Sequence, residues 1–182
     1  MKRVLLISVI AIAVITFFMR EKIQDAFFGS DLPEPTSIAF EKQVPIFSYN
    51  WRLIGSKGTV MSFVEYMNRN VIVNYWSPNS KESVEELKQW AKLYDDYKND
   101  IYFIFVTKDS QQDVNKFLKE KGYVFPVFYS GSTPLKTIVL EKAPRTYLIT
   151  KSGRVTVDHS GVANWNSENF RKLLDDIIKQ NK

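Results

Sequence analysis

The order of apolar strands and amphipathic helices between residues 71 and 107 constrains the fold of this chain more than any other feature. The segment VIVNYW (71–76) has the composition and length of a buried strand, and IYFIFVT (101–107) is a second one. Between them, residues 83–98 place apolar side chains at three- and four-residue spacings, which predicts one helix. Because two strands joined through a helix form a right-handed parallel crossover, we expect an α/β fold.

The flanking segments extend this unit into a mixed sheet. A helix is predicted over 110–122 and ends at Gly122, and a terminal helix is predicted over 167–180. Segment 44–60 is strand-like and holds one or two edge strands with a turn at Gly55–Gly58. A further strand is predicted at 124–130, where Pro126 interrupts the pattern. The last two strands, 145–150 and 154–161, flank a hairpin turn at Lys151-Ser152-Gly153. We expect helices on both faces of this sheet.

The first 28 residues form a segment of a different kind. Sixteen uncharged residues, 4–19, lie between Lys2-Arg3 and Arg20-Glu21-Lys22. As a helix they span roughly 24 Å, and basic residues at both ends can extend toward the headgroups of a bilayer core of roughly 30 Å. No small-x-small cleavage site follows. An uncleaved N-terminal signal anchor, a single transmembrane helix within 1–28, is therefore favoured over a cleaved signal peptide.

The anchor implies a topology and a domain division. As the first element it leaves the N-terminus inside, so that the C-terminal domain is extracytoplasmic, in a periplasm or at the cell surface. Residues 29–39 contain Gly, Ser and two Pro residues, which is typical of a linker. Residues 40–182 then form the folded domain.

Composition excludes several kinds of chemistry. The chain has no Cys and one His, His159, so disulfide, thiolate and multi-histidine metal sites are excluded. We expect no metal and no cofactor. The net charge of +5 is spread along the chain without long basic runs, which argues against nucleic-acid binding.

Two separated motifs resemble one known family. In the segment NVIVNYWSPNSKESVEELKQW, Tyr75-Trp76 is followed by three residues and then by Ser80-Lys81-Glu82-Ser83. Further on, Ala143-Pro144-Arg145-Thr146 precedes Tyr147-Leu148-Ile149. Both resemble the thioredoxin-like TlpA/ResA group of extracytoplasmic thiol–disulfide reductases, in which Cys-x-x-Cys opens a helix after a Phe-Trp strand end and a cis proline faces the cysteines. The resemblance covers roughly 40–182 and implies a thioredoxin-like fold.

The chain departs from this family at the residues that carry its chemistry. Ser80 and Ser83 stand at the two cysteine positions, Asn79 replaces the family's Trp, and Lys88 replaces a Pro within the helix. The family's glutamate is kept as Glu86. Because a serine hydroxyl cannot be oxidised to a bridge, the family's thiol–disulfide exchange is expected to be absent.

The retained residues have binding and structural interpretations. The binding candidates are Trp76, Asn79, Glu86, Pro144, Arg145 and Thr146, because a cis-proline turn exposes a backbone edge at which extended peptide can pair as an added strand. The structural alternatives are a helix cap from Asn79 with Glu82, and a second from Ser83 with Glu86 or a solvated face for Glu86. Trp76 would then be a core residue, and His159 a surface or packed strand residue.

These observations lead to one expected function and two alternatives. The expectation is a membrane-anchored, redox-inactive binding or scaffold module that contacts the membrane through residues 4–19 and takes an extended peptide or protein partner. The first alternative is an accessory subunit of an extracytoplasmic thiol–disulfide oxidoreductase or of a cytochrome maturation system. The second is a serine-dependent enzyme, for which Ser80 lacks a recognisable base. Whether the chain is an enzyme stays open, and the absence of cysteine argues against it.

Overall fold

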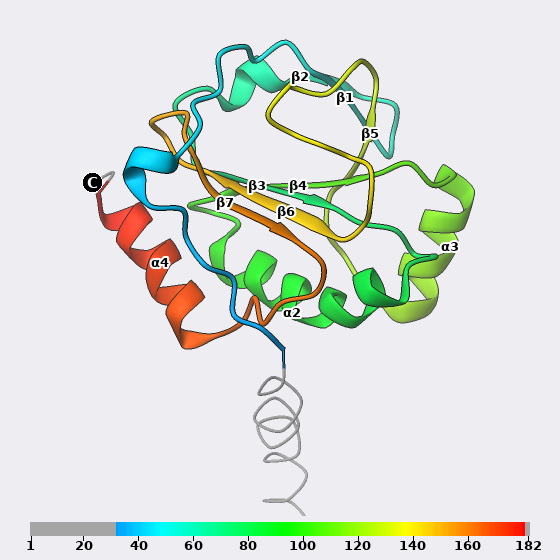
Figure 1. The fold of residues 1–182 in the computed structure, drawn as a ribbon. Coiled ribbons are helices and arrows are strands. Elements are labelled where there is room, and N and C mark those ends of the chain that lie inside the picture. Colours follow the sequence, from blue (N-terminus) through cyan, green and yellow to red (C-terminus); the bar gives the residue numbers. More distant parts are fainter. Residues whose placement is uncertain (1–31, 181–182) are drawn as a thin grey trace, which may run out of the picture. The chain divides into compact units, whose positions relative to one another are not determined.

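The strand–helix–strand unit predicted at 71–107 is present in the structure, a computed structural model that describes residues 32–180 (Figure 1). Its two strands pair in parallel, with Val71 opposite Tyr102. The elements in chain order are η1 (Phe40–Lys42), β1 (Arg52–Gly55), β2 (Val60–Ser62), η2 (Phe63–Tyr66), β3 (Val71–Tyr75), α2 (Lys81–Tyr97), β4 (Tyr102–Thr107), α3 (Gln111–Lys121), β5 (Val127–Ser130), β6 (Arg145–Ile149), β7 (Val155–Ser160) and α4 (Glu168–Lys179).

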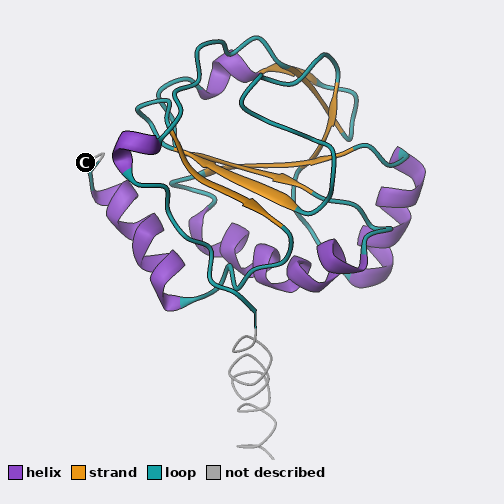
Figure 2. Ribbon diagram, viewed as in Figure 1, coloured by secondary structure: helices purple, strands orange, loops and turns teal. Residues whose placement is uncertain are grey.

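These strands, orange in Figure 2, form one mixed sheet. Their order across the sheet is β2-β1-β5-β4-β3-β6-β7. β3, β4 and β5 are parallel, whereas β6 and β7 form the predicted antiparallel hairpin. The turn between β1 and β2 closes at Gly55–Gly58 as expected, but β1 is not an edge strand, because it pairs with both β2 and β5. β5 begins only after Pro126, which cannot donate a backbone hydrogen bond to the sheet.

The expectation of helices on both faces is wrong for the α-helices of residues 32–180. α2, α3 and α4 contribute to one hydrophobic core cluster on a single face of the sheet (Figure 1). The opposite face is covered by η2, the β1 region and the loop 131–144. Side chains alternate between the two faces along each central strand, so each strand contributes to both core clusters. Ile72 faces the helices, while Val71 and Val73 face the loop side.

The strand order explains why the helices share a face. β3, β4 and β5 lie side by side in chain order, so both right-handed crossovers advance in the same direction across the sheet. α2 and α3 must therefore fall on the same side. The return from β5 to β6 passes through the loop 131–144, whose residues Leu135, Ile138 and Leu140 are buried in the second core.

The segment predicted as a linker belongs in part to the folded unit. The compact unit begins at Pro33, whose carbonyl accepts a hydrogen bond from Asn164 N, and Ile38 N donates to Thr156 O on β7. The linker prediction for 29–39 is therefore wrong from Pro33 onward. The anchor predicted at 4–19 lies outside the described residues. Within 32–180, no helix has the length and apolar character that a bilayer crossing requires.

Candidate functional site

The candidate site lies where β3 ends and α2 begins. Ser80 is the N-cap of α2, and its Oγ accepts a 3.2 Å hydrogen bond from the backbone N–H of Ser83. The predicted cap formed by Asn79 with Glu82 is therefore wrong by one residue. Asn79 is engaged elsewhere, because its side-chain Nδ2 donates to Asp109 at 2.7 Å.

The proline loop lies directly against this helix start. The Ala143–Pro144 peptide bond is cis, which is the isomer that the motif implied. The Ser80 hydroxyl donates to the carbonyl of Ala143 at 3.4 Å, so residues 63 positions apart in the chain meet here. The structure thus joins the two motifs on which the family resemblance rests.

The two serines differ in exposure. Ser83 is 1% exposed, and its Oγ accepts a hydrogen bond from Ser77 N at 3.3 Å, whereas Ser80 is half-buried. The partners that the described structure gives to Ser80 Oγ are a carbonyl and a backbone N–H, and neither can take its proton. His159 packs edge-on against Trp165 instead. This arrangement offers no activated serine nucleophile.

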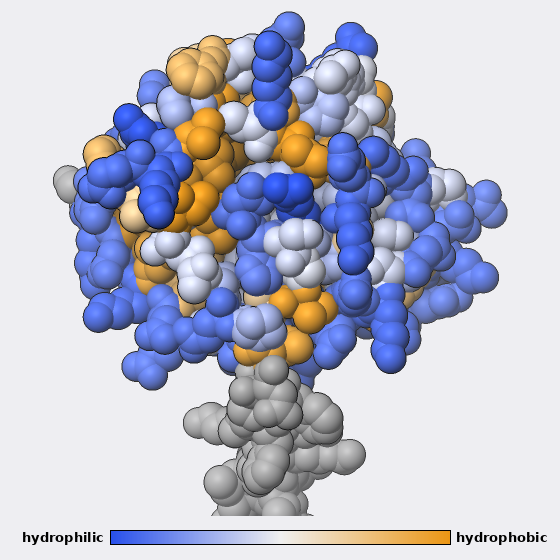
Figure 3. Space-filling view, viewed as in Figure 1, coloured by the Kyte–Doolittle hydropathy of each residue, from blue (hydrophilic) through white to orange (hydrophobic). Residues whose placement is uncertain are grey.

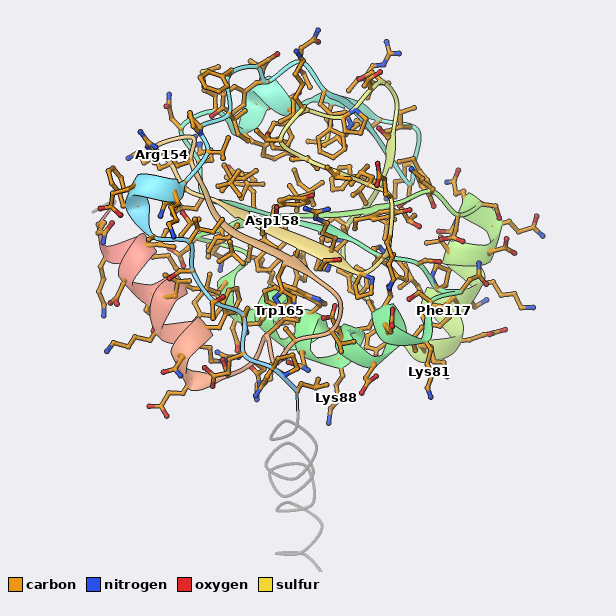
Figure 4. All side chains as sticks on the ribbon, in the orientation of Figure 1. Lys81, Lys88, Phe117, Arg154, Asp158 and Trp165 are labelled. Atoms are coloured by element: carbon orange, nitrogen blue, oxygen red, sulfur yellow. The ribbon has the colours of Figure 1, made fainter. Side chains whose placement is uncertain are left out.

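Glu86 is a buried structural residue, which overturns the prediction of a cap or a solvated face. Its side chain is 1% exposed and accepts hydrogen bonds from Trp165 Nε1 at 2.6 Å, Ala163 N at 2.9 Å and Trp90 Nε1 at 3.3 Å. Burial raises the pKa of Glu86 to about 7, although these hydrogen bonds oppose the rise. The carboxylate joins α2 to the loop that precedes α4, where Trp165 is labelled in Figure 4.

Asp109 is a site residue that the sequence reasoning missed. It follows β4 and accepts hydrogen bonds from Asn79 and from Thr107 Oγ1, the latter at 2.9 Å. Burial alone would raise its pKa, but hydrogen bonds from Ser77, Asn79 and Thr107 outweigh burial and lower the pKa below its usual value. A signal was available, because the carboxyl ends of the neighbouring parallel strands β3 and β4 meet at one edge of the sheet.

Most of the predicted binding residues are buried. Trp76 and Thr146 are each 1% exposed, and Pro144 is buried too. Trp76 packs against Phe117 and Phe125, which leaves it no surface for a partner. Thr146 Oγ1 accepts from Asn74 Nδ2 at 2.9 Å.

The predicted open edge at Arg145 and Thr146 does not exist. β6 is an interior strand: Thr146 pairs with Asn74 on β3 and with His159 on β7. Arg145 is half-buried and forms a bidentate ion pair with Asp158, at 2.9 and 3.0 Å. The accessible part of the site is therefore Asn79, Ser80 and the Ala143 backbone.

Comparison with known proteins places this geometry in context. No family model matches the chain. The thiol-disulfide oxidoreductase ResA of Bacillus thuringiensis subsp. konkukian is 24% identical over 134 residues, which are 72% of this chain and 74% of ResA. ResA of Bacillus cereus matches equally well.

Solved structures show the same fold. A DsbF homologue from Corynebacterium diphtheriae matches with a TM-score of 0.60 and 15% identity, over 81% of this chain and 95% of that one. The thioredoxin domain of a thiol-disulfide oxidoreductase from Bacteroides vulgatus gives 0.56 and 15%, over 74% and 98%. The chain is therefore a thioredoxin-like protein related to the ResA-type thiol-disulfide oxidoreductases, with Ser80 and Ser83 at the positions of the family's cysteines and no cysteine elsewhere.

Proposed function

We propose that this chain is a membrane-anchored, extracytoplasmic thioredoxin-like protein that binds a protein partner without redox chemistry. One observation carries the proposal: the Ser80 hydroxyl lies 3.4 Å from the Ala143 carbonyl, at a helix start that keeps the family's framework without its sulfur. Thiol–disulfide exchange requires a thiolate and a resolving sulfur, and the chain has no cysteine to supply either.

The binding surface is expected at the start of α2 rather than along β6. Asn79 is exposed, and Ser80 and Ala143 are half-buried beside it. Glu82, in the first turn of α2, is exposed next to them. A partner that reaches this surface contacts polar side chains and backbone, because the apolar residues below are enclosed in the two cores.

Membrane anchoring is proposed from the apolar run at 4–19, which basic residues flank on both sides. The relatives named ResA suggest a second candidate, in which this chain is an accessory subunit of an extracytoplasmic thiol–disulfide oxidoreductase or of a cytochrome maturation system. This accessory role requires a partner that itself carries redox-active cysteines, which would then meet the retained helix start and proline loop.

A crosslinking experiment tests the binding proposal. A photoreactive amino acid replaces Glu82 in the full chain in native membranes, and the matched control replaces Lys172, which is exposed on α4. We expect one protein adduct that forms from position 82 and not from 172. Equal labelling from both positions, or none from position 82, contradicts the proposal. An adduct whose partner has a redox-active cysteine pair selects the accessory-subunit role.

A further inference from the structure

A cavity of about 360 Å³ lies beside the turn between β6 and β7, at the opposite end of β6 from the candidate site. The segment 37–43, the turn between β6 and β7, and the C-terminal half of α4 enclose it, and its walls include Ser37, Phe40, Gln43, Lys151, Ser152 and Gln180. This volume is within the range of small-ligand pockets. The helices and loops of the candidate site contribute none of these residues.

The cavity is suited to an anion that also carries polar groups. Among the described residues 32–180, Lys151 is the one charged residue that lines it, and no Asp or Glu does. Lys151, Ser37 and Ser152 are exposed, so an ammonium and the Ser37 hydroxyl are available as donors. The Ser152 hydroxyl lies 2.9 Å from Thr150 Oγ1 and can donate to a ligand when Thr150 supplies the proton of that bond. The adjoining η1 carries Glu41 and Lys42 and adds no net charge.

Phe40 lines the cavity with a cation over its ring, and further exposed apolar side chains follow it in the same segment, at Val44 and Phe47. Phe40 is 65% exposed, and the Arg154 guanidinium carbon lies 4.9 Å from the centre of its ring. Val44 and Phe47 are 48% and 87% exposed, and Ile46 N bonds to Gly153 O in the turn beside Lys151. Figure 3 shows hydrophobic residues exposed among charged ones on this face, and Figure 4 labels Arg154 above η1. Exposed aromatic and basic side chains together are typical of surfaces that contact a bilayer.

We propose that this cavity binds the phosphate-bearing headgroup of an anionic phospholipid, with Phe40 and Phe47 in the interfacial region of the bilayer. This inference rests on the proposed membrane anchoring. Residues 20–31 can reach roughly 40 Å when extended, so an anchor at 4–19 lets the surface around η1 come to the membrane. Lys151 neutralises the phosphate, and the serine hydroxyls donate to its oxygens.

A titration of the full chain in nonionic detergent tests the site. Because the chain has no cysteine, Thr36→Cys provides a unique position for a fluorophore beside Ser37, and Val124→Cys provides an exposed control position in the loop between α3 and β5. The probes are short-chain phosphatidylglycerol, short-chain phosphatidylcholine and inorganic phosphate. We expect a saturable change with phosphatidylglycerol at position 36 alone. Lys151→Gln should weaken it about tenfold, whereas Lys81→Gln, on α2, should not.

The other outcomes overturn the proposal in distinct ways. An equal response to phosphatidylcholine excludes an anionic headgroup site, and an equal response to inorganic phosphate identifies a free-anion site. No saturable response, or no effect of Lys151→Gln, excludes the cavity itself. Carbonate extraction of the full chain from membranes reports the anchor separately, so that loss of the proposed anchoring is distinguished from loss of the lipid site.

Discussion

The indole of Trp165 donates a 2.6 Å hydrogen bond to the buried carboxylate of Glu86, and the two rings of Trp165 and Trp90 lie with centroids 4.8 Å apart beside it. This contact joins α2 to the loop before α4 across 79 positions of the chain. Glu86 stands where the ResA-like family carries a glutamate near its cysteines. In this chain, Glu86 instead holds α2 and the loop before α4 together.

The pH dependence of stability should reveal this carboxyl group. The pKa of Glu86 is about 7 in the folded chain against an ordinary 4.5. Below pH 4.5, Glu86 is protonated in both the folded and the unfolded chain. Between pH 4.5 and pH 7, only the unfolded chain loses this proton, so the free energy of unfolding falls as pH rises until the folded group also ionises near pH 7. The free energy of unfolding should fall by about 3 kcal/mol from pH 4 to pH 8. Glu86→Gln should flatten this slope in chemical denaturation, and an unchanged slope would contradict the assignment.

Asp109 should act with the opposite sign at acid pH. Its pKa is lowered in the fold by hydrogen bonds, which outweigh the effect of burial. The stability that it contributes is present above its ordinary pKa of 3.8 and is lost as pH falls through the lower folded value. Asp109→Asn should therefore reduce the acid sensitivity of the wild type below pH 4, followed by circular dichroism. An acid limb as steep as that of the wild type would contradict this assignment.

Restoring both sulfurs tests whether the framework of the site is intact. Ser80 and Ser83 are neighbours at the N-cap and third position of α2, where the helix N-terminus lowers a thiol pKa. We expect Ser80→Cys with Ser83→Cys to form an intramolecular disulfide and to reduce insulin measurably faster than the wild type, which should match the uncatalysed rate. Full family activity is not expected, because Asn79 and Lys88 also differ. Ser83→Cys alone, which is 1% exposed, should remain inactive.

A side chain at Gly153, in the turn between β6 and β7, should destabilise the fold by more than its backbone strain alone. Its φ is +74°, and an added Cβ would lie 2.6 Å from the Tyr49 hydroxyl oxygen. Gly58 has a similar φ of +79° but open space around it. Gly58→Ala should lower the free energy of unfolding by about 1 kcal/mol from backbone strain. Gly153→Ala should lower it by more, and equal losses in denaturant titrations would show that Tyr49 moves aside freely.

The state of the N-terminus tests the proposed anchor. The native protein should retain Met1 or its processed equivalent and remain in membranes after a high-salt or carbonate wash, because an uncleaved apolar helix stays in the bilayer. Intact-mass analysis of the protein extracted from membranes gives the result. A mature N-terminus near residue 30 would show instead that the segment is a cleaved signal peptide.

Local pattern predicted most elements of the fold. The pattern of neighbouring residues is enough to predict the buried strand at 71–75 and the helix that ends at Gly122, and the structure confirms both. The placement of α3 on the same face as α2 was missed, because it depends on where β5 pairs, which no single segment encodes. The hairpin prediction was right, but the sequence did not show that β6 would pair with β3 on one side and with β7 on the other.

The candidate site was harder to predict for the same reason. The meeting of Ser80 with Ala143 followed from two family motifs, and the hydrogen bond confirms it. The burial of Glu86 depends on Trp165, far along the chain, so helical spacing alone favoured a cap or a wet face. Asp109 has no motif of its own, and only the adjacency of two strand ends brings it to Asn79.

The segment 38–44, which is hydrogen-bonded to β7, has a consequence for aggregation at high protein concentration. Ile38 bonds to Thr156, and Val44 accepts from Val155, so the first residues of β7 are already paired on their outer side within the chain. At the opposite end of the sheet, β2 has only the three residues Val60–Ser62. Edge strands are the sites where sheets join into aggregates. Both edges of the sheet therefore offer a shortened stretch of open backbone through which one copy could pair with the next.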